Sequence, residues 1–427
     1  MTGAARFSSL QEWLAWQETL HPKAIDLGLE RVSAVARRLA CTRPAATVIS
    51  VAGTNGKGSC VALLEAVLRQ AGYRVGAYTS PHLLRYNERI RINGEPVEDA
   101  ALCDAFARVD AARAGETLTY FEFGTLAALD IMSASDLDVA LLEVGLGGRL
   151  DAVNLVDADA ALITSIGIDH VDWLGSDRDS IAREKAGILR AGHPAVCGDP
   201  DPPDSLLACA VRNSTELAVA GRDFFHSAQD QGWSWQGRVR REDDLPLPAL
   251  PGDHQLANAA AVLAVLEALD ARLPVTRAAL VAGLQGVSLP GRLQHIGGAV
   301  DQLLDVSHNA QAAQALANAL RRMPVAGHCY AVLGMMKDKD SQAYVQPLLS
   351  LVDTWLVTGL QVERAAAPEQ LAAAVAACAP ARAPVVCPDI RAALGVLRER
   401  VQPGDRVLVC GSFYTVAEWS ALRAEFY

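Results

Sequence analysis

The sequence predicts an α/β fold in two domains: a larger N-terminal domain with a mainly parallel sheet and a smaller, Rossmann-like C-terminal domain. Apolar runs alternate with helical segments, which is typical of a parallel sheet covered on both faces. The chain has 427 residues, more than one hydrophobic core usually organises. The alternation begins a second time after a Pro- and Gly-containing stretch near 289–299. We therefore expect domains at 1–290 and 291–427.

The elements follow in order along the chain. Helical spacing predicts helices over 9–20, opened by a serine cap, and near 29–40. A strand at 47–52 and a helix at 58–71 enclose a glycine-rich loop, and three more strands lie within 73–82, 136–151 and 157–170. Alternating aromatic and polar residues predict a β-hairpin over 224–239, followed by a helix within 250–269. In the second half we expect strands near 301–306, 329–333, 353–358 and 406–411.

Composition narrows the function classes. The net charge of −11 argues against a nucleic-acid-binding protein, which would carry a basic face. The N-terminus lacks a signal-peptide core, and we find no apolar run of roughly 18 residues, so no membrane span is expected. Nine cysteines form no C-x-x-C pair, which indicates reduced thiols. We expect a cytoplasmic monomer whose partners are small molecules.

The loop "GTNGKGS" at 53–59 follows the first strand directly. Its backbone N–H groups and Lys57 are suited to hold phosphates at a helix N-terminus, which indicates a P-loop-type ATPase domain. It departs from the common phosphate-loop pattern, because Gly58 stands where a hydroxyl is expected and Val51 where the first glycine is expected. The alternative is an ordinary tight turn between strand and helix.

Other polar residues follow the ends of the remaining strands, where parallel sheets bind ligands. Ser80 is a possible hydroxyl ligand of Mg²⁺, or simply part of a turn. Glu143 ends an apolar strand, so it needs a cation: either Mg²⁺ or Arg149. His170 lies just past another strand, where it is either a ligand or a structural histidine.

Lys185 in "REKAGILR" is expected at the start of a helix, and its spacing alone favours a solvated ion pair with Glu184. In the second half, "LLDVSHNAQA" places Asp305, His308 and Asn309 at the end of a strand. Each of these clusters is compatible with plain loop chemistry when taken separately.

The glycine loop, "LEVGLGGRLDAVN", "TSIGIDHVDWLG", "REKAGI", "LPGR" and "DVSHN" occur in this order along the chain. This set resembles the Mur ligase superfamily, and more closely the folylpolyglutamate synthase and dihydrofolate synthase family. The resemblance extends from about residue 25 to residue 416. It implies that a carboxylate attacks the γ-phosphate of ATP, and that the amine of L-glutamate then attacks the resulting acyl phosphate.

The resemblance also implies roles for individual residues. The ATP-binding set would be Thr54, Asn55, Gly56, Lys57, Gly58, Ser59, Asn258, Arg292 and Asp305, with the ribose at Asp305 and phosphates at Arg292. Two Mg²⁺ sites would use Ser80 with Glu143 and Glu143 with His170, and Lys185 would be carried as a carbamate. The catalytic set would be Lys57, Lys185, Asp305 and His308, and Ser412 with His308 would face the incoming glutamate or the acyl phosphate. Ser307, Ala310 and Tyr414 stand where relatives usually have Ala, Pro and His.

The loop "KAIDLGLERV" and the stretch "LTYFEFGTL" resemble the bifunctional bacterial enzymes, which make dihydrofolate from dihydropteroate and then extend the glutamate tail of tetrahydrofolates. The pocket for dihydropteroate or folate would comprise Asp26, Leu27, Gly28, Thr119, Tyr120, Phe121, Glu122, Leu150, Asp151 and Asn154. Without the resemblance, Tyr120 and Phe121 are more simply explained as core residues at a helix start.

Four functions remain open at this stage: a bifunctional dihydrofolate and folylpolyglutamate synthase, a ligase restricted to polyglutamylation, a cell-wall Mur ligase, and a nucleotide-gated binding protein without chemistry. The pterin-loop resemblance favours the first.

Overall fold

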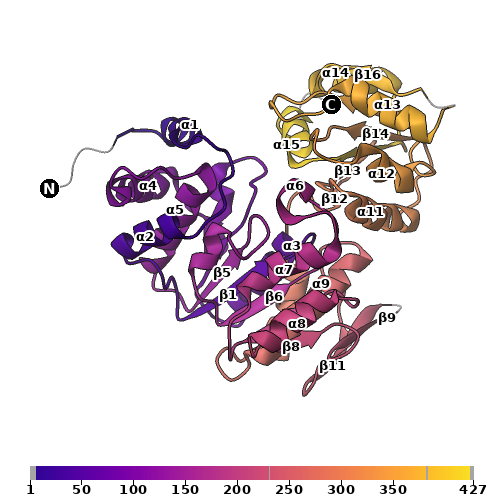
Figure 1. The fold of residues 1–427 in the computed structure, drawn as a ribbon. Coiled ribbons are helices and arrows are strands. Elements are labelled where there is room, and N and C mark those ends of the chain that lie inside the picture. Colours follow the sequence, from indigo (N-terminus) through magenta and orange to yellow (C-terminus); the bar gives the residue numbers. More distant parts are fainter. Residues whose placement is uncertain (1–5, 230, 381–382, 424–427) are drawn as a thin grey trace. The chain divides into compact units, whose positions relative to one another are not determined.

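The computed structural model describes residues 6–229, 231–380 and 383–423. It contains two compact units, shown in Figure 1. The first comprises residues up to Ala249 together with Leu256–Val287. The second comprises Leu250–Gln255 and the chain from Ser288 onward.

An eight-stranded sheet forms the centre of the first unit. Its order is β4-β3-β2-β5-β1-β6-β7-β8, and β2 and the five strands beyond it are parallel, whereas β3 and β4 run antiparallel. The bounds are β1 Thr47–Ala52, β2 Val75–Tyr78, β3 Ile90–Ile92, β4 Glu95–Pro96, β5 Val139–Glu143, β6 Ala160–Ile163, β7 Pro194–Cys197 and β8 Glu216–Val219. Every residue of β1, β2, β5 and β6 is buried, because helices cover both faces.

Alternate residues of these strands point to opposite faces of the sheet. One face packs on a layer that contains α1, α2, α4 and α5, with Trp13, Phe106 and Phe123 at its centre. Helix α3 packs against β1, β2 and β5 and is itself in contact with α10. The helices of this unit are α1 Leu10–Leu20, α2 Glu30–Leu39, α3 Lys57–Gln70, α4 Asp99–Arg113, α5 Tyr120–Ser133, α6 Val171–Leu174, α7 Arg178–Lys185, α8 Asp204–Arg212, α9 Asp253–Ala268 and α10 Arg277–Gly286, with 3-10 turns at Tyr86–Arg89, Ala152–Leu155 and Ala186–Ile188.

A second, antiparallel sheet in the first unit has the order β11-β10-β9. Its strands are β9 Phe225–Gln229, β10 Gly232–Gln236 and β11 Arg241–Leu245. Trp233 and Trp235 of β10 are fully buried, and the Trp235 indole N–H donates to the Ala260 carbonyl of α9 at 3.0 Å. These tryptophans fix the small sheet to α9.

The second unit has a six-stranded sheet in the order β12-β13-β17-β14-β15-β16, parallel except for β12. Its core contains Leu303, Leu333, Trp355 and Leu408. The elements are β12 Gln294–Ile296, β13 Asp301–Leu304, β14 Cys329–Leu333, β15 Thr354–Thr358, β16 Val385–Cys387, β17 Arg406–Cys410, α11 Ala310–Arg322, α12 Ser341–Val345, α13 Pro368–Cys378, α14 Ile390–Arg400 and α15 Phe413–Leu422, with a 3-10 turn at Gln346–Leu348.

The mainly parallel N-terminal sheet and the separate C-terminal α/β sheet confirm the predicted fold class. The first strand, the serine-capped first helix and the hairpin lie where the sequence predicts them. All nine cysteines are free thiols. Among the helices of the described residues, none is both long and apolar enough to cross a membrane.

Candidate active site

The glycine loop between β1 and α3 has a backbone that only glycine fits at two positions. Gly53 has φ 151°, and an added Cβ would lie 1.8 Å from Thr164 Oγ1. Gly56 has φ 88°, and its Cβ would lie 2.5 Å from Asn258 Oδ1. Positive φ and close neighbours together explain both glycines. Asn258, predicted to bind ATP, therefore lies directly beside the loop.

Hydrogen bonds tie this loop to the segment that follows β6. The Thr54 hydroxyl donates to the Gly167 carbonyl and accepts from the Gly167 N–H, each at 3.0 Å. The Asn55 N–H donates to Ser165 Oγ at 3.1 Å, and the Thr164 hydroxyl donates to the Asn55 carbonyl at 2.6 Å. These hydrogen bonds to residues 164–167 therefore fix the conformation of the loop.

Lys57 is the first residue of α3, a helix of 14 residues. Its ammonium donates to the Gly53 carbonyl at 2.9 Å and to the Thr54 carbonyl at 3.3 Å. Lys57 puts its charge next to the backbone N–H groups at the start of α3, and both the charge and the helix N-terminus attract phosphate. Ser59, in the first turn of the same helix, is buried.

Glu143 ends β5 beside the glycine loop, because Val51 of β1 is its register partner. The side chain is buried, and Glu143 Oε2 accepts the Ser80 N–H at 3.2 Å. The structure thus brings Ser80 and Glu143 together. Arg149 pairs instead with Glu184 at 2.8 Å. The alternative explanations, in which Arg149 neutralises Glu143 and Glu184 pairs with Lys185, are therefore wrong.

Lys185 is buried, 3% exposed, and is the last residue of α7. The prediction that it starts a helix is wrong, because Asp177 caps α7 eight residues earlier. Burial, and then the nearby charge of Lys57, lower the pKa of Lys185 to about 7, against the opposing effects of Asp169 and Asp151. The amine is therefore partly uncharged near neutral pH and lies close to the lysine of the glycine loop.

His170 precedes α6 with φ 52°, and its N–H donates to Asp169 Oδ1 at 2.8 Å. The left-handed backbone places it at the end of the segment that is bonded to the glycine loop. Within the described residues, no group of three or more His, Cys, Asp and Glu side chains is arranged to hold a metal ion. Ser80 and Glu143 fit a hard divalent cation, since both offer oxygen.

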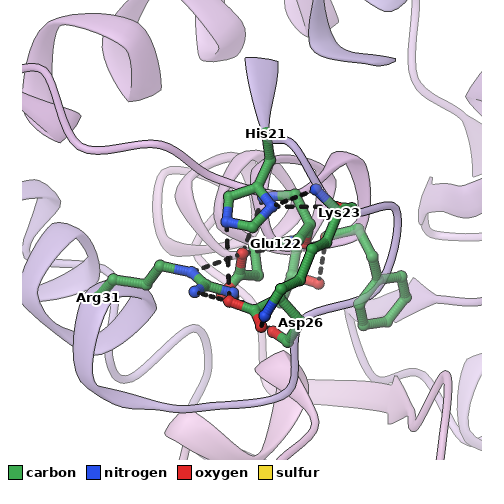
Figure 2. Close-up of polar contacts among 8 residues, drawn as sticks. His21, Lys23, Asp26, Arg31 and Glu122 are labelled. Atoms are coloured by element: carbon green, nitrogen blue, oxygen red, sulfur yellow. Dashed lines mark hydrogen bonds and ion pairs between the residues drawn. The ribbon is translucent and has the colours of Figure 1, made fainter. Parts of the chain in front are cut away.

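Asp26 lies in a cluster of charged side chains before α2, shown in Figure 2. The Arg31 guanidinium contacts the Asp26 carboxylate and donates to its carbonyl at 2.6 Å, while Arg31 Nε donates to both Glu122 oxygens at 2.9 and 3.0 Å. Lys23 adds a hydrogen bond to Asp26 Oδ1 at 3.0 Å, and His21 Nε2 lies 3.7 Å from Asp26 Oδ2. Hydrogen bonds from Arg31 and then Lys23 lower the pKa of Asp26 to about 2. Arg31 thus fastens the loop of Asp26, Leu27 and Gly28 to α5.

The first turn of α5 is fixed by a capping box. Thr119 Oγ1 accepts the Glu122 N–H at 3.3 Å, and Glu122 Oε2 accepts the Thr119 N–H at 2.8 Å. Glu122 is therefore occupied by the helix cap and by Arg31. These contacts make Thr119 and Glu122 the frame that orients Tyr120 and Phe121.

Phe121 lies over the backbone at the end of β5. Its ring centroid is 6.1 Å from that of Tyr78, and a Cβ added to Gly145 would lie 2.6 Å from the ring. Tyr120 forms an edge contact with Tyr86 at 5.9 Å. Tyr120 and Phe121 lie at the start of α5, as expected if they are core residues at a helix start, but both side chains are partly exposed. Phe121 is therefore partly accessible to solvent.

Asp151 and Asn154 belong to the turn after the glycine-rich stretch that follows β5. Asp151 accepts backbone N–H groups from Leu146 at 2.8 Å and Val153 at 3.0 Å, and burial raises its pKa to about 6. The Asn154 amide donates to the Arg149 and Gly187 carbonyls at 3.1 and 3.0 Å. Both side chains thus shape the turn. The partly exposed Leu150 lies within it.

In the second unit, Asp305 follows β13 and orders the loop before β12. Its two oxygens accept the Leu293 and Ser307 N–H groups, each at 2.9 Å. The Arg292 guanidinium lies 5.4 Å from the Phe413 ring centroid, and the His308 ring lies 6.4 Å from the same ring. Arg292, Asp305 and His308 are therefore neighbours within this unit.

One of the sequence departures, Ser307, has a structural explanation. The Ser307 hydroxyl is bonded to the buried Tyr344 hydroxyl at 2.8 Å, which gives this serine a structural partner that alanine would lack. Ser412 caps α15 and is also bonded to Thr415 Oγ1 at 2.7 Å. Tyr414 is half exposed, and nothing in the structure explains its choice.

Sequence reasoning missed the residues that hold others in place. Arg31 was not identified, although it stands in the quoted pterin-loop motif, because a surface arginine on a helix gives no signal of its partners. Thr164 is a buried threonine directly after β6, and its residue type likewise gives no signal of the loop carbonyl that it bonds. His254 lies within electrostatic reach of Asp305 and Arg292 in the second unit, and burial lowers its pKa.

Comparison with known proteins places this geometry in a family. The Mur ligase middle domain matches residues 51–266, and the Mur ligase glutamate ligase domain matches residues 291–413. The dihydrofolate synthase/folylpolyglutamate synthase of Escherichia coli (strain K12) is 43% identical over 410 residues, which cover 96% of this chain and 94% of the relative.

Solved structures agree. E. coli FolC in complex with DHPP and ADP superposes with a TM-score of 0.93 at 42% identity, covering 99% of each chain. A bifunctional folylpolyglutamate synthase/dihydrofolate synthase with Mn, AMPPNP and L-glutamate bound gives a TM-score of 0.91 at 45% identity, covering 99% of this chain and 100% of the other. The chain therefore belongs to the Mur ligase family, in its dihydrofolate synthase/folylpolyglutamate synthase branch.

Proposed function

We propose that this protein is an ATP-dependent ligase that joins L-glutamate to dihydropteroate, giving dihydrofolate, and to the γ-carboxylate of folylpolyglutamates. One observation carries the proposal: the first unit brings together the glycine loop, Glu143 and Lys185, whose pKa is lowered to about 7. The chain is also 43% identical to a relative named for both activities. Solved structures of relatives with ADP, AMPPNP, DHPP or L-glutamate bound support the same substrates.

The reaction has two steps. A carboxylate oxygen of the substrate attacks the γ-phosphorus of ATP, and ADP leaves, which gives an acyl phosphate. The amino nitrogen of glutamate then attacks the acyl carbon, loses a proton and forms the amide as inorganic phosphate leaves. Both reactants are anions, so positioning and charge neutralisation supply most of the catalysis.

The chain's own residues serve the first step as follows. Lys57 and the α3 N-terminus neutralise the phosphates, and the bonds between the loop and residues 164–167 keep the loop ready for the nucleotide. Asn258 borders the loop at Gly56. A divalent ion held by Ser80 and Glu143 would polarise phosphate and carboxylate oxygens. A second site, with Glu143 and His170, belongs to the same proposal.

Lys185 is proposed to act as a carbamate. The neutral amine is the form that attacks CO₂, with the nitrogen–carbon bond forming as a proton leaves to solvent. A pKa of about 7 supplies that form near neutral pH. Mass spectrometry under mild conditions would detect the added mass, and an unmodified ammonium in contact with phosphate in a nucleotide complex would refute the assignment.

The remaining residues are assigned by their positions. Asp305 and Arg292 would bind the ribose and phosphates of ATP, and His308 and Ser412 the glutamate or the acyl phosphate. Phe121, with the loop of Asp26, would hold the pterin, because a flat heteroaromatic ring needs an aromatic face and a few polar anchors. The domain limits 1–290 and 291–427, a monomeric state and a cytoplasmic location without nucleic-acid or membrane partners complete the proposal.

An ADP-release assay tests the function. ATP is supplied with dihydropteroate and then with tetrahydrofolate, each with and without L-glutamate. We expect ADP release with either acceptor when glutamate is present. ADP release with tetrahydrofolate but not with dihydropteroate, each with glutamate present, would restrict the protein to polyglutamylation. Activity on a UDP-muramyl substrate would assign it to cell-wall synthesis. No ADP release with any acceptor would refute ligation.

A further inference from the structure

Arg89 is a buried arginine without a carboxylate partner among the residues that the structure describes. It is 9% exposed and ends the 3-10 turn Tyr86–Arg89. Its hydrogen bond to another side chain runs from Nε to His82 Nδ1 at 2.9 Å. A histidine side chain is neutral or positively charged, so His82 provides no counter-charge to Arg89.

The carboxylates of Glu88, Asp99 and Glu65 all have partners other than Arg89. Glu88 accepts the N–H groups of residues 83–85 at 2.7, 2.8 and 2.7 Å, and so is spent on the turn itself. Arg85 pairs with Asp99 at 3.1 Å, and Arg91 pairs with Glu65 at 2.8 Å. Of the three arginines in residues 85–91, Arg89 therefore alone has no anion.

Aromatic rings hold this guanidinium in place. Its central carbon lies 5.1 Å from the Tyr86 ring centroid and 5.5 Å from that of Tyr120. Stacking on two rings orients the planar fork and excludes water from its faces. A desolvated cation without an anion is costly, so the arrangement is suited to receive an anion from outside the protein.

Arg89 lies beside both parts of the proposed acceptor site. The Thr79 N–H donates to the Arg89 carbonyl at 2.8 Å, and the next residue, Ser80, donates to Glu143. The charge of Arg89 also acts on Tyr78, whose ring faces Phe121. Arg89 is thus close in the fold to Ser80 at the metal-binding edge and to Tyr78, which contacts the ring assigned to the pterin.

We propose that Arg89 binds the α-carboxylate of the terminal glutamate of folate substrates, the carboxylate that is not activated. This inference rests on the proposed function. A folate presents two carboxylates on its terminal glutamate, and only the γ-carboxylate goes to ATP. Dihydropteroate has a single carboxylate, which the reaction itself consumes. Arg89 therefore serves the second activity of the protein and not the first.

The test measures KM for two acceptors with Arg89→Gln. A charge-assisted hydrogen bond contributes enough that its loss should raise KM for tetrahydrofolate by about ten- to a hundredfold. KM for dihydropteroate should stay close to the wild-type value. Arg85→Gln, which removes an exposed and paired arginine from the same turn, controls for the general loss of charge. An equal rise for both acceptors, or a rise in KM for ATP instead, would overturn the proposal.

A substrate variant gives a second measurement that does not depend on folding of the mutant. A tetrahydrofolate analogue with 4-aminobutyrate in place of glutamate keeps the γ-carboxylate and lacks the α-carboxylate. The wild-type enzyme should bind it with a KM raised by a similar factor, and Arg89→Gln should add no further rise. If the wild-type enzyme has the same KM for the analogue and for tetrahydrofolate, Arg89 does not bind this carboxylate. Absence of ADP release by the wild-type enzyme with either natural acceptor would instead refute the proposed function.

Discussion

Lys185 should make the stability of the first unit depend on pH. Burial moves its pKa from the ordinary 10.5 to about 7 in the folded protein. Between these values the unfolded chain binds more protons than the folded chain, so the free energy of unfolding rises with pH. Each pH unit corresponds to about 1.4 kcal/mol. The stability of wild-type protein relative to Lys185→Met should therefore improve by roughly 2 to 3 kcal/mol between pH 7 and pH 9.

Below pH 7 the full cost of charging the buried amine is present in the wild-type protein, so Lys185→Met should be the more stable protein there. The unfolding of this unit can be followed separately by the reactivity of Cys60, which is fully buried in α3. We would expose both proteins to urea at several pH values, label free thiols briefly and quantify Cys60 by mass spectrometry. Nucleotide and bicarbonate are left out, so that the free amine is measured.

Lys23→Met is the matched control, because it removes an exposed lysine from the same unit. A stability difference between wild-type and Lys185→Met that does not change from pH 7 to pH 9 would refute the reasoning. It would mean that the amine keeps its charge in the folded protein, and the carbamate proposal would lose its support.

Further predictions concern the nucleotide, the metal and the acceptor. Lys57→Ala should lower kcat by about a hundredfold or more, since it removes charge compensation at the phosphates, and a near-normal kcat in the ADP assay would mean that the loop is misassigned. Glu143→Gln should raise the Mg²⁺ concentration required for half-maximal rate, and an unchanged metal titration would contradict its role. Asp26→Ala should raise KM for dihydropteroate more than for tetrahydrofolate, because a substrate without a glutamate tail depends more on its pterin contacts; equal losses would exclude Asp26 from that pocket. Gly53→Ala should destabilise the protein by about 1 to 3 kcal/mol through the clash next to the loop, as measured by thermal unfolding. Gly72 has a positive φ of 92° and open space around it, so Gly72→Ala measures the cost of a positive φ without a clash.

The sequence predicted the central strands well because they are buried on both faces, and such strands are continuous apolar runs. Short strands such as β3, β4, β12 and β16 contain only two or three residues and therefore leave no clear pattern. Helix caps were predictable where a hydroxyl precedes an apolar repeat, as at Ser9.

Pairing between distant charges could not be read in the same way. The sequence around Lys185 is typical of an exposed helix, yet α7 packs so that this residue is buried. Arg149 stands six residues from Glu143 but pairs with Glu184, 35 positions away. Proximity along the chain therefore suggested the wrong partners, and only the tertiary fold selects the right ones.

The reciprocal bonds between Thr54 and Gly167 join two places that would otherwise be independent. A nucleotide that shifts the loop must also shift the segment that leads to His170, so occupancy at one place changes affinity at the other by the same factor in both directions. Titrating nucleotide at low and at saturating divalent ion would measure that factor directly. Thermodynamic linkage of this kind would favour nucleotide binding when the metal is in place, and so would limit unproductive hydrolysis of ATP.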